Sequence, residues 1–82
     1  MVRAEFTKDF QRKFSKIKDS SLKEKIIKQI KKIKENPEIG KPMKNVRKGT
    51  RELYIKPFRL SYAFLQEKEL VYILDLYHKD KQ

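Results

Sequence analysis

Hydrophobic residues in the first half of the chain recur first at strand spacing and then at helical spacing. Residues 2–6 alternate apolar and polar side chains, which predicts a short strand. Four apolar residues then follow at steps of four, four and three: Phe6, Phe10, Phe14 and Ile17. This spacing places them on one face of a helix. Thr7 offers an N-cap oxygen to this helix, which we expect to end near Lys18.

A second amphipathic segment follows the polar run Asp19-Ser20-Ser21. We predict a capping box at its start, in which the Ser21 hydroxyl accepts a hydrogen bond from the Glu24 amide and the Glu24 carboxylate reaches back. An apolar stripe at helical spacing follows: Leu22, Ile26, Ile27, Ile30 and Ile33. Asn36-Pro37 should end this helix, because proline disfavours a helical conformation in the residue before it.

The second half of the chain has the pattern of a loop followed by three strands. Residues 37–49 hold two of the three prolines and both glycines, which predicts a loop. Residues 51–56 and 58–65 alternate, and a polar hairpin connection at 66–69 leads to an apolar run at 70–74 that is typical of an interior strand. We therefore predict an α+β fold of order β-α-α-β-β-β, with two antiparallel helices packed on one face of a small, mostly antiparallel sheet.

Length and charge limit the class of protein. With 82 residues, we expect a single domain that spans residues 1–82. The chain has 22 Lys+Arg against 11 Asp+Glu and a net charge of +11, which indicates a polyanionic partner. It has no cysteine and one histidine, so we expect neither a metal site nor a cofactor. No apolar run approaches the ~20 residues of a membrane helix, and we expect a cytoplasmic protein without a membrane partner.

Basic residues gather in and around the predicted loop. Six of them form a candidate nucleic-acid-binding set: Lys41, Lys44, Arg47, Lys48, Arg51 and Lys56. Tyr54, Phe58 and Tyr62 lie among or beside them, where aromatic rings could stack on bases. A phosphodiester backbone is the favoured partner of this set, and an acidic protein segment is the second choice. We interpret most lysines of the two helices as a solvated face.

A candidate catalytic site follows from the expected hairpin. Imidazole is the side chain best suited to moving protons near neutral pH, and His78 is the only histidine, although a polar residue near a chain end needs no function. If the last two strands pair around residues 66–69, Arg59 lies beside Tyr77, His78 and Lys79. We expect these residues on the sheet face opposite the helices, where their positive charge would form a phosphate-sized site.

The chain also carries a succession of short motifs: Asn36-Pro37, Gly40-Lys41-Pro42, Gly49, Arg51-Glu52-Leu53, Phe58-Arg59-Leu60-Ser61-Tyr62 and Tyr77-His78-Lys79. In this order they resemble the RelE/YoeB branch of the RelE/ParE toxin superfamily. The resemblance covers essentially the whole chain and implies the RelE-like fold. Members are small basic toxins of type II toxin–antitoxin pairs. Many of them enter the ribosomal A site and cut mRNA there, while the ParE branch inhibits DNA gyrase.

The resemblance also implies roles for individual residues. Arg59 matches an arginine that stabilises charge on the scissile phosphate, and His78 matches a general acid, with Tyr77 and Lys79 on either side of it. The general base is open, because Met43 stands where YoeB-like proteins commonly have a glutamate. Glu52 is a candidate base only if its side chain faces the site, and an ion pair with a neighbouring cation is the other interpretation.

The resemblance therefore implies a metal-independent mRNA endoribonuclease that acts in the ribosomal A site by attack of a 2′-hydroxyl on the scissile phosphate. A cognate acidic, RelB-like antitoxin would neutralise it, and no small-molecule cofactor is implied. Two alternatives stay open: a non-catalytic RNA- or ribosome-binding protein of the same fold, and a gyrase inhibitor of the ParE type.

Overall fold

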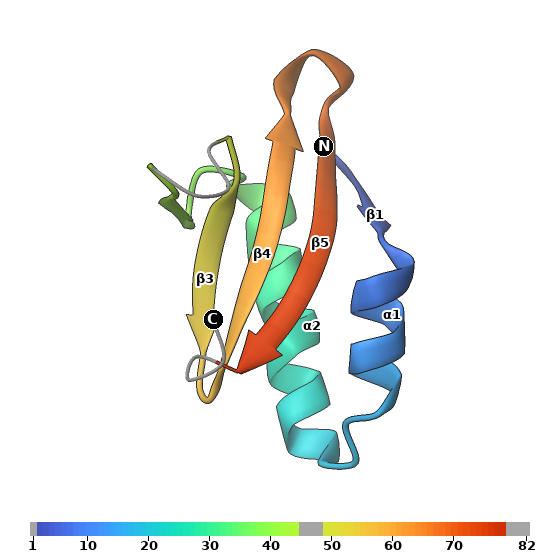
Figure 1. Ribbon diagram of the computed structural model, residues 1–82. Helices are drawn as coiled ribbons and strands as arrows, with labels where there is room; N and C mark the ends of the chain where they lie inside the picture. Colours follow the sequence, from blue (N-terminus) through green and yellow to red (C-terminus); the bar gives the residue numbers. More distant parts are fainter. Residues whose placement is uncertain (1, 45–48, 79–82) are drawn as a thin grey trace.

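The computed structural model describes residues 2–44 and 49–78. Its elements follow in the order β1 (Arg3–Phe6), α1 (Lys8–Ser15), α2 (Ser20–Glu35), β2 (Lys41–Pro42), β3 (Arg51–Ile55), β4 (Phe58–Leu65), the short 3-10 helix η1 (Gln66–Lys68) and β5 (Leu70–His78). The strands form one five-stranded sheet in the order β1-β5-β4-β3-β2 (Figure 1). β1 runs parallel to β5, and the other pairs are antiparallel. The α+β prediction is confirmed, and the sheet is mixed.

The strand β2 was not predicted from the sequence. Lys41 and Pro42 pair with Glu52 and Arg51 at the edge of the sheet, inside the segment expected to be a loop. Two residues are too few to show an alternating pattern, and proline is tolerated in a strand mainly at an edge. This short strand fixes the start of the basic segment against β3.

The predicted start of the first helix is confirmed. The Thr7 hydroxyl oxygen accepts a hydrogen bond from the Phe10 amide at 3.1 Å. The helix ends at Ser15, three residues before Lys18. The rings of Phe6, Phe10 and Phe14 stack in sequence with centroids 5.6 Å apart, although Phe6 belongs to β1 and Ile17 lies beyond the end of α1.

The capping box predicted for the second helix is wrong. α2 begins at Ser20, and its N-cap is Asp19, whose Oδ1 accepts hydrogen bonds from the amides of Ser21 at 2.9 Å and Leu22 at 3.3 Å. A carboxylate caps as well as a hydroxyl does and also carries a negative charge to the positive end of the helix dipole. The predicted end before Asn36-Pro37 is confirmed, since α2 stops at Glu35.

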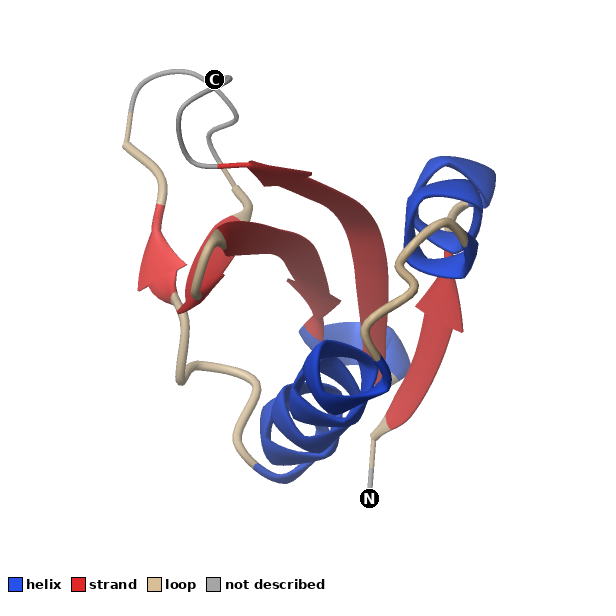
Figure 2. Ribbon diagram, turned by 90° about the horizontal axis from the view of Figure 1, so that it is seen from below, coloured by secondary structure: helices blue, strands red, loops and turns tan. Residues whose placement is uncertain are grey.

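The core lies between the helices and one face of the sheet. Figure 2 shows the sheet curving around α2, with α1 on the β1 side, and α1 packs against β5. The core consists of ten buried side chains from both layers: Phe10, Ile26, Ile30, Ile33, Ile55, Leu60, Tyr62, Val71, Ile73 and Leu76. The helices thus cover one sheet face and leave the opposite face of β3, β4 and β5 for other contacts.

Candidate functional site

Three side chains from three neighbouring strands form a row across the open face of the sheet. Arg59 on β4 lies directly opposite Tyr54 on β3 and directly opposite Tyr77 on β5. Residues that oppose each other on paired strands project to the same face. The adjacent residue Leu60 is buried toward the helices, so this row points away from them. The predicted pairing of Arg59 with Tyr77 is confirmed, and we call Tyr54, Arg59 and Tyr77 the Arg59 row.

A second row of polar residues runs beside the Arg59 row. It consists of four residues in cross-strand register: Lys41, Glu52, Ser61 and Asp75. Glu52 is only 7% exposed, and its Oε1 lies 3.3 Å from Nη1 of Arg59. Glu52 therefore faces the candidate site and forms an ion pair with Arg59, which confirms the ion-pair interpretation, while its role as a base stays a prediction.

His78 does not share a face with Arg59, and this part of the predicted site is wrong. The β4–β5 register places His78 opposite Phe58, and the two rings meet edge to face with centroids 5.8 Å apart. Phe58 packs against the core on the helix side. Because neighbouring residues of a strand point to opposite faces, only one of Tyr77 and His78 can join Arg59. The register selects Tyr77.

Tyr62 is buried and anchors the loop after α2, which corrects its prediction as a base-stacking residue. Its hydroxyl donates a hydrogen bond to the Pro37 carbonyl at 2.8 Å and accepts one from the Gly40 amide at 2.8 Å. Burial raises the pKa of the Tyr62 phenol, while the Gly40 amide and the Arg51 charge act in the opposite direction. A Cβ atom at Gly40 would lie 2.7 Å from the Tyr62 hydroxyl oxygen, so this close approach requires glycine.

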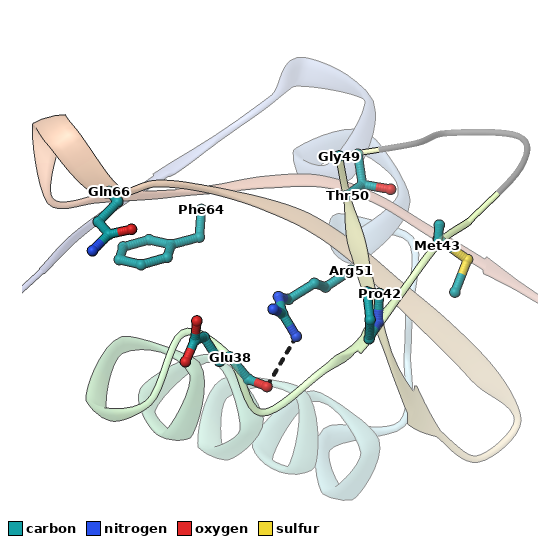
Figure 3. Close-up of a pocket in the computed structure, with 8 residues that line it drawn as sticks. All are labelled: Glu38, Pro42, Met43, Gly49, Thr50, Arg51, Phe64 and Gln66. Atoms are coloured by element: carbon teal, nitrogen blue, oxygen red, sulfur yellow. Dashed lines mark hydrogen bonds between the residues drawn. The ribbon is translucent and has the colours of Figure 1, made fainter.

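Arg51 belongs to the same anchor. Its Nη1 donates hydrogen bonds to the carbonyl oxygens of Glu38 at 3.1 Å and Gly40 at 2.8 Å. Figure 3 shows the Arg51 side chain pointing into a cavity of about 270 Å³ whose wall also includes Met43 and Phe64. One function of Arg51 is therefore to hold the loop that carries Lys41.

Two other residues of the predicted basic set, Lys41 and Lys44, lie between α2 and β3, whereas Lys56 lies in the turn between β3 and β4. Lys41, Lys44 and Lys56 are exposed. Three predicted residues lie outside the described ones: Arg47, Lys48 and Lys79. Lys41 stands in register with Glu52, so it adds positive charge on the face that carries Arg59.

The described residues contain neither a cluster of metal-binding side chains nor a helix that could span a membrane. Within residues 2–44 and 49–78, no three side chains of the metal-binding types cluster. In the same part of the chain, neither helix is long and apolar enough to cross a bilayer. The candidate site itself combines the Arg59 guanidinium, the phenols of Tyr54 and Tyr77 and the Glu52 carboxylate.

Solved structures of toxins share this fold. One chain of the E. coli RelBE toxin–antitoxin complex superimposes with a TM-score of 0.80 at 16% identity, covering 95% of this chain and 96% of that one. The RelBE2 complex from Mycobacterium tuberculosis gives 0.81 at 24% identity, with 95% and 98% covered. The YoeB/ParE toxin from Agrobacterium tumefaciens gives 0.83 at 18%, with 94% and 98% covered. A search of curated proteins gives no match.

The fold and the sequence comparison together define a toxin of a type II toxin–antitoxin system with the RelE/YoeB/ParE fold. The chain belongs to the ParE toxin family, since the family model described as "ParE toxin of type II toxin-antitoxin system, parDE" matches residues 4–82. The expected membership in the RelE/ParE superfamily is confirmed.

Two contacts of the site region were missed by sequence reasoning. Asp75 Oδ1 lies 2.8 Å from Nζ of Lys13, which ties α1 to β5 at the end of the polar row. Tyr54 was noted as an aromatic near the basic set, but its place beside Arg59 depends on the β3–β4 register. No local signal in the sequence predicts the Asp75–Lys13 pair, because the two residues are far apart in the chain.

Proposed function

We propose that this toxin is an endoribonuclease that cuts mRNA in the ribosomal A site of the cytoplasm, without a metal ion. The Arg59 row carries the proposal: a guanidinium stands between two phenols in cross-strand register. The Arg59 side chain is 37% exposed, and Tyr54 as a whole residue is 51% exposed. Aromatic rings stack on unpaired RNA bases, and arginine pairs with phosphate.

In the proposed reaction, the 2′-hydroxyl oxygen attacks the adjacent phosphorus, the P–O5′ bond breaks and a cyclic phosphate forms. The 2′-hydroxyl loses its proton, and the leaving 5′ oxygen gains one. Arg59 stabilises the negative charge that develops on the phosphate oxygens. Glu52 orients Arg59 through the 3.3 Å ion pair. The carboxylate of Glu52, which faces the same site, accepts the 2′ proton in this proposal.

The end of β5 offers two candidates for the proton donor to the 5′ oxygen. Tyr77 lies opposite Arg59, and His78 lies opposite Phe58 on the helix side. The implied role of His78 as general acid is therefore less well supported by the geometry than the same role for Tyr77. We assign the donor to Tyr77, with Lys79 following as a source of positive charge.

Expression of variants tests this assignment. We expect wild-type toxin to arrest growth and to generate new mRNA 5′ ends, and we expect Arg59→Ala and Tyr77→Phe to reduce both. His78→Ala should retain more cleavage than Tyr77→Phe. Lys28→Ala is the matched control, because Lys28 is exposed on α2. Arrest by Arg59→Ala equal to that of the wild type would show that the Arg59 row is not the site.

An acidic antitoxin is the proposed protein partner, and α1 and α2 offer a surface for it. An apolar groove of about 390 Å³ is lined by six residues: Phe6, Phe10, Gln11, Phe14, Ile27 and Ile30. Phe6 is 39% and Ile27 46% exposed. A second copy of the chain would bring another charge of +11 to this groove, whereas an acidic amphipathic segment matches both its charge and its apolar lining. Ile27→Lys should weaken binding of the co-expressed antitoxin more than Lys28→Glu.

Gyrase inhibition is the second candidate function, because the matching family model is described as ParE toxin. Non-catalytic occupancy of RNA or the ribosome is the third, and Met43 in place of a glutamate favours it. DNA damage with continuing translation would support gyrase inhibition. Blocked translation without new mRNA ends would support occupancy alone.

A further inference from the structure

A second groove lies on the helix side of the sheet, where β5 ends, and it shares Tyr77 with the Arg59 row. It has a volume of about 520 Å³ and lies between the end of α1, the start of α2 and the paired ends of β4 and β5. Its floor is apolar and comes from both layers: Ile17, Leu22, Phe58 and Leu76. The His78 ring packs edge to face on Phe58 with centroids 5.8 Å apart, so one wall of the groove is aromatic.

The rim of this groove is cationic. Lys13, Lys16 and Lys18 line it from α1 and the connection to α2. Lys13 is held by Asp75 at 2.8 Å, while Lys16 and Lys18 are exposed. Asp19 is the acid of the groove, and its Oδ1 caps α2. An apolar, aromatic floor under a lysine rim fits a ligand that combines a flat ring with negative charge.

We propose that this groove is a second nucleotide-binding subsite, which takes the nucleotide next to the one on the Arg59 row. The base lies on the floor against Phe58 and His78, and its phosphate lies at Lys16 and Lys18. This inference rests on the proposed function in so far as it takes RNA as the ligand. In it, His78 contacts a flanking base and is not the proton donor.

Continuity between the two surfaces favours RNA as the occupant. Tyr77 lines the groove and also stands opposite Arg59, so a strand bound at Arg59 passes Tyr77 at the end of β5 and reaches the groove. A second copy of the chain is disfavoured by its charge of +11. An acidic peptide could also bind the lysines, but its binding would not explain why the groove adjoins Arg59. Binding of such a peptide is an alternative outcome of the test.

The test measures the dissociation constant of a short single-stranded RNA with methylated 2′-hydroxyls, which the toxin cannot cleave, at several salt concentrations. Phe58→Leu keeps an apolar side chain and removes the stacking ring, and Phe64→Leu is its control on the same strand. We expect Phe58→Leu to weaken binding by roughly ten-fold, since stacking of one base on an aromatic ring has an effect of this order. Phe64→Leu should have little effect.

A second pair of variants tests the rim. Lys16→Glu/Lys18→Glu should lower the slope of log Kd against log salt by about 1.4, which corresponds to roughly 0.7 for each of two phosphate contacts on a single strand. The control Lys28→Glu/Lys31→Glu makes the same charge change at exposed positions of α2 that do not line the groove. A smaller change is expected for this control.

Equal effects of each variant and its control on RNA binding would overturn the inference. Binding of an acidic peptide in place of the RNA, sensitive to Phe58→Leu, would also overturn it. Failure of the proposed function has a different result: RNA binds and the Phe58 variant weakens it, but the wild-type protein cuts no mRNA. The two failures are therefore distinguishable.

Discussion

Glu52 Oε1 lies 3.3 Å from Nη1 of Arg59, and the carboxylate is buried while the guanidinium reaches the surface. Glu52 stands on β3 and Arg59 on β4, in adjacent cross-strand pairs of the same face. A buried carboxylate beneath an exposed cation fixes the direction of the cation more firmly than a surface pair, because few other positions are open to it. The position of the Arg59 side chain is therefore set by the pairing of β3 with β4, which brings Glu52 beside it.

Removing the charge of Glu52 should therefore affect both folding and toxicity. Glu52→Gln keeps the shape of the side chain and loses the ion pair, and we expect it to lower the free energy of unfolding by about 1–3 kcal/mol. It should also reduce growth arrest, because Arg59 is then held less firmly. Chemical denaturation and growth curves measure the two effects. Glu24→Gln, at an exposed position of α2, should change neither; an equally stable and equally toxic Glu52→Gln would show that the pair does not position Arg59.

Loss of the Tyr62 hydroxyl should loosen the loop between α2 and β3. Tyr62→Phe keeps the ring but leaves the buried Gly40 amide without its 2.8 Å acceptor, which should cost about 1–3 kcal/mol of unfolding free energy. Hydrogen exchange of the Gly40 amide should become faster. Tyr54→Phe is the control, since Tyr54 is exposed. Unchanged exchange at Gly40 in Tyr62→Phe would contradict the anchor.

The pKa of Tyr62 predicts how stability changes at high pH. Burial raises this pKa above its ordinary value of 10.0, so the fold favours the neutral phenol. The stabilisation that results is fully present below pH 10.0 and is lost as the pH rises through the higher pKa of the folded state. In denaturation experiments at pH values from below to well above 10.0, the wild type should lose stability more steeply than Tyr62→Phe. Parallel curves of unfolding free energy against pH for the two proteins would contradict this prediction. Both proteins contain the same lysines, so their titration affects both curves equally.

Two substitutions distinguish the two possible caps of α2. Asp19→Ala removes the carboxylate that accepts from Ser21 and Leu22 and should lower the free energy of unfolding by about 0.5–2 kcal/mol. Ser21→Ala should have an effect near zero, because Ser21 lies inside the helix. Thermal and urea unfolding of both variants give the comparison. A larger loss of unfolding free energy in Ser21→Ala than in Asp19→Ala would support the capping box instead.

Sequence reasoning predicted the elements well because their patterns are local. The spacing of Phe6, Phe10 and Phe14 and the alternation from Phe58 onward depend on residues a few positions apart. The errors came where two local solutions compete: both Asp19 and Ser21 are good caps. They came also where the pattern is too short to read, as at Lys41–Pro42.

The candidate site was predicted in part for the same reason. Pairing of the last two strands around a polar turn put Arg59 beside Tyr77, and the register agrees. The face of His78 was wrong, although alternation alone separates it from Tyr77. Burial of Tyr62 and its contacts with Gly40 were not predictable, because they depend on how the loop after α2 folds back on the sheet.

The amino-acid sequence by itself determined the order of the elements other than β2 and η1, and the net positive charge of the chain. Hydrophobic periodicity and charge are properties of short stretches of sequence. They therefore indicate the helices and strands before the tertiary arrangement is known. Only the tertiary structure decided which residues meet: Glu52 with Arg59, Lys13 with Asp75, and His78 with Phe58. These contacts depend on strand register and on the place of α1 beside β5, which many residues set together through packing.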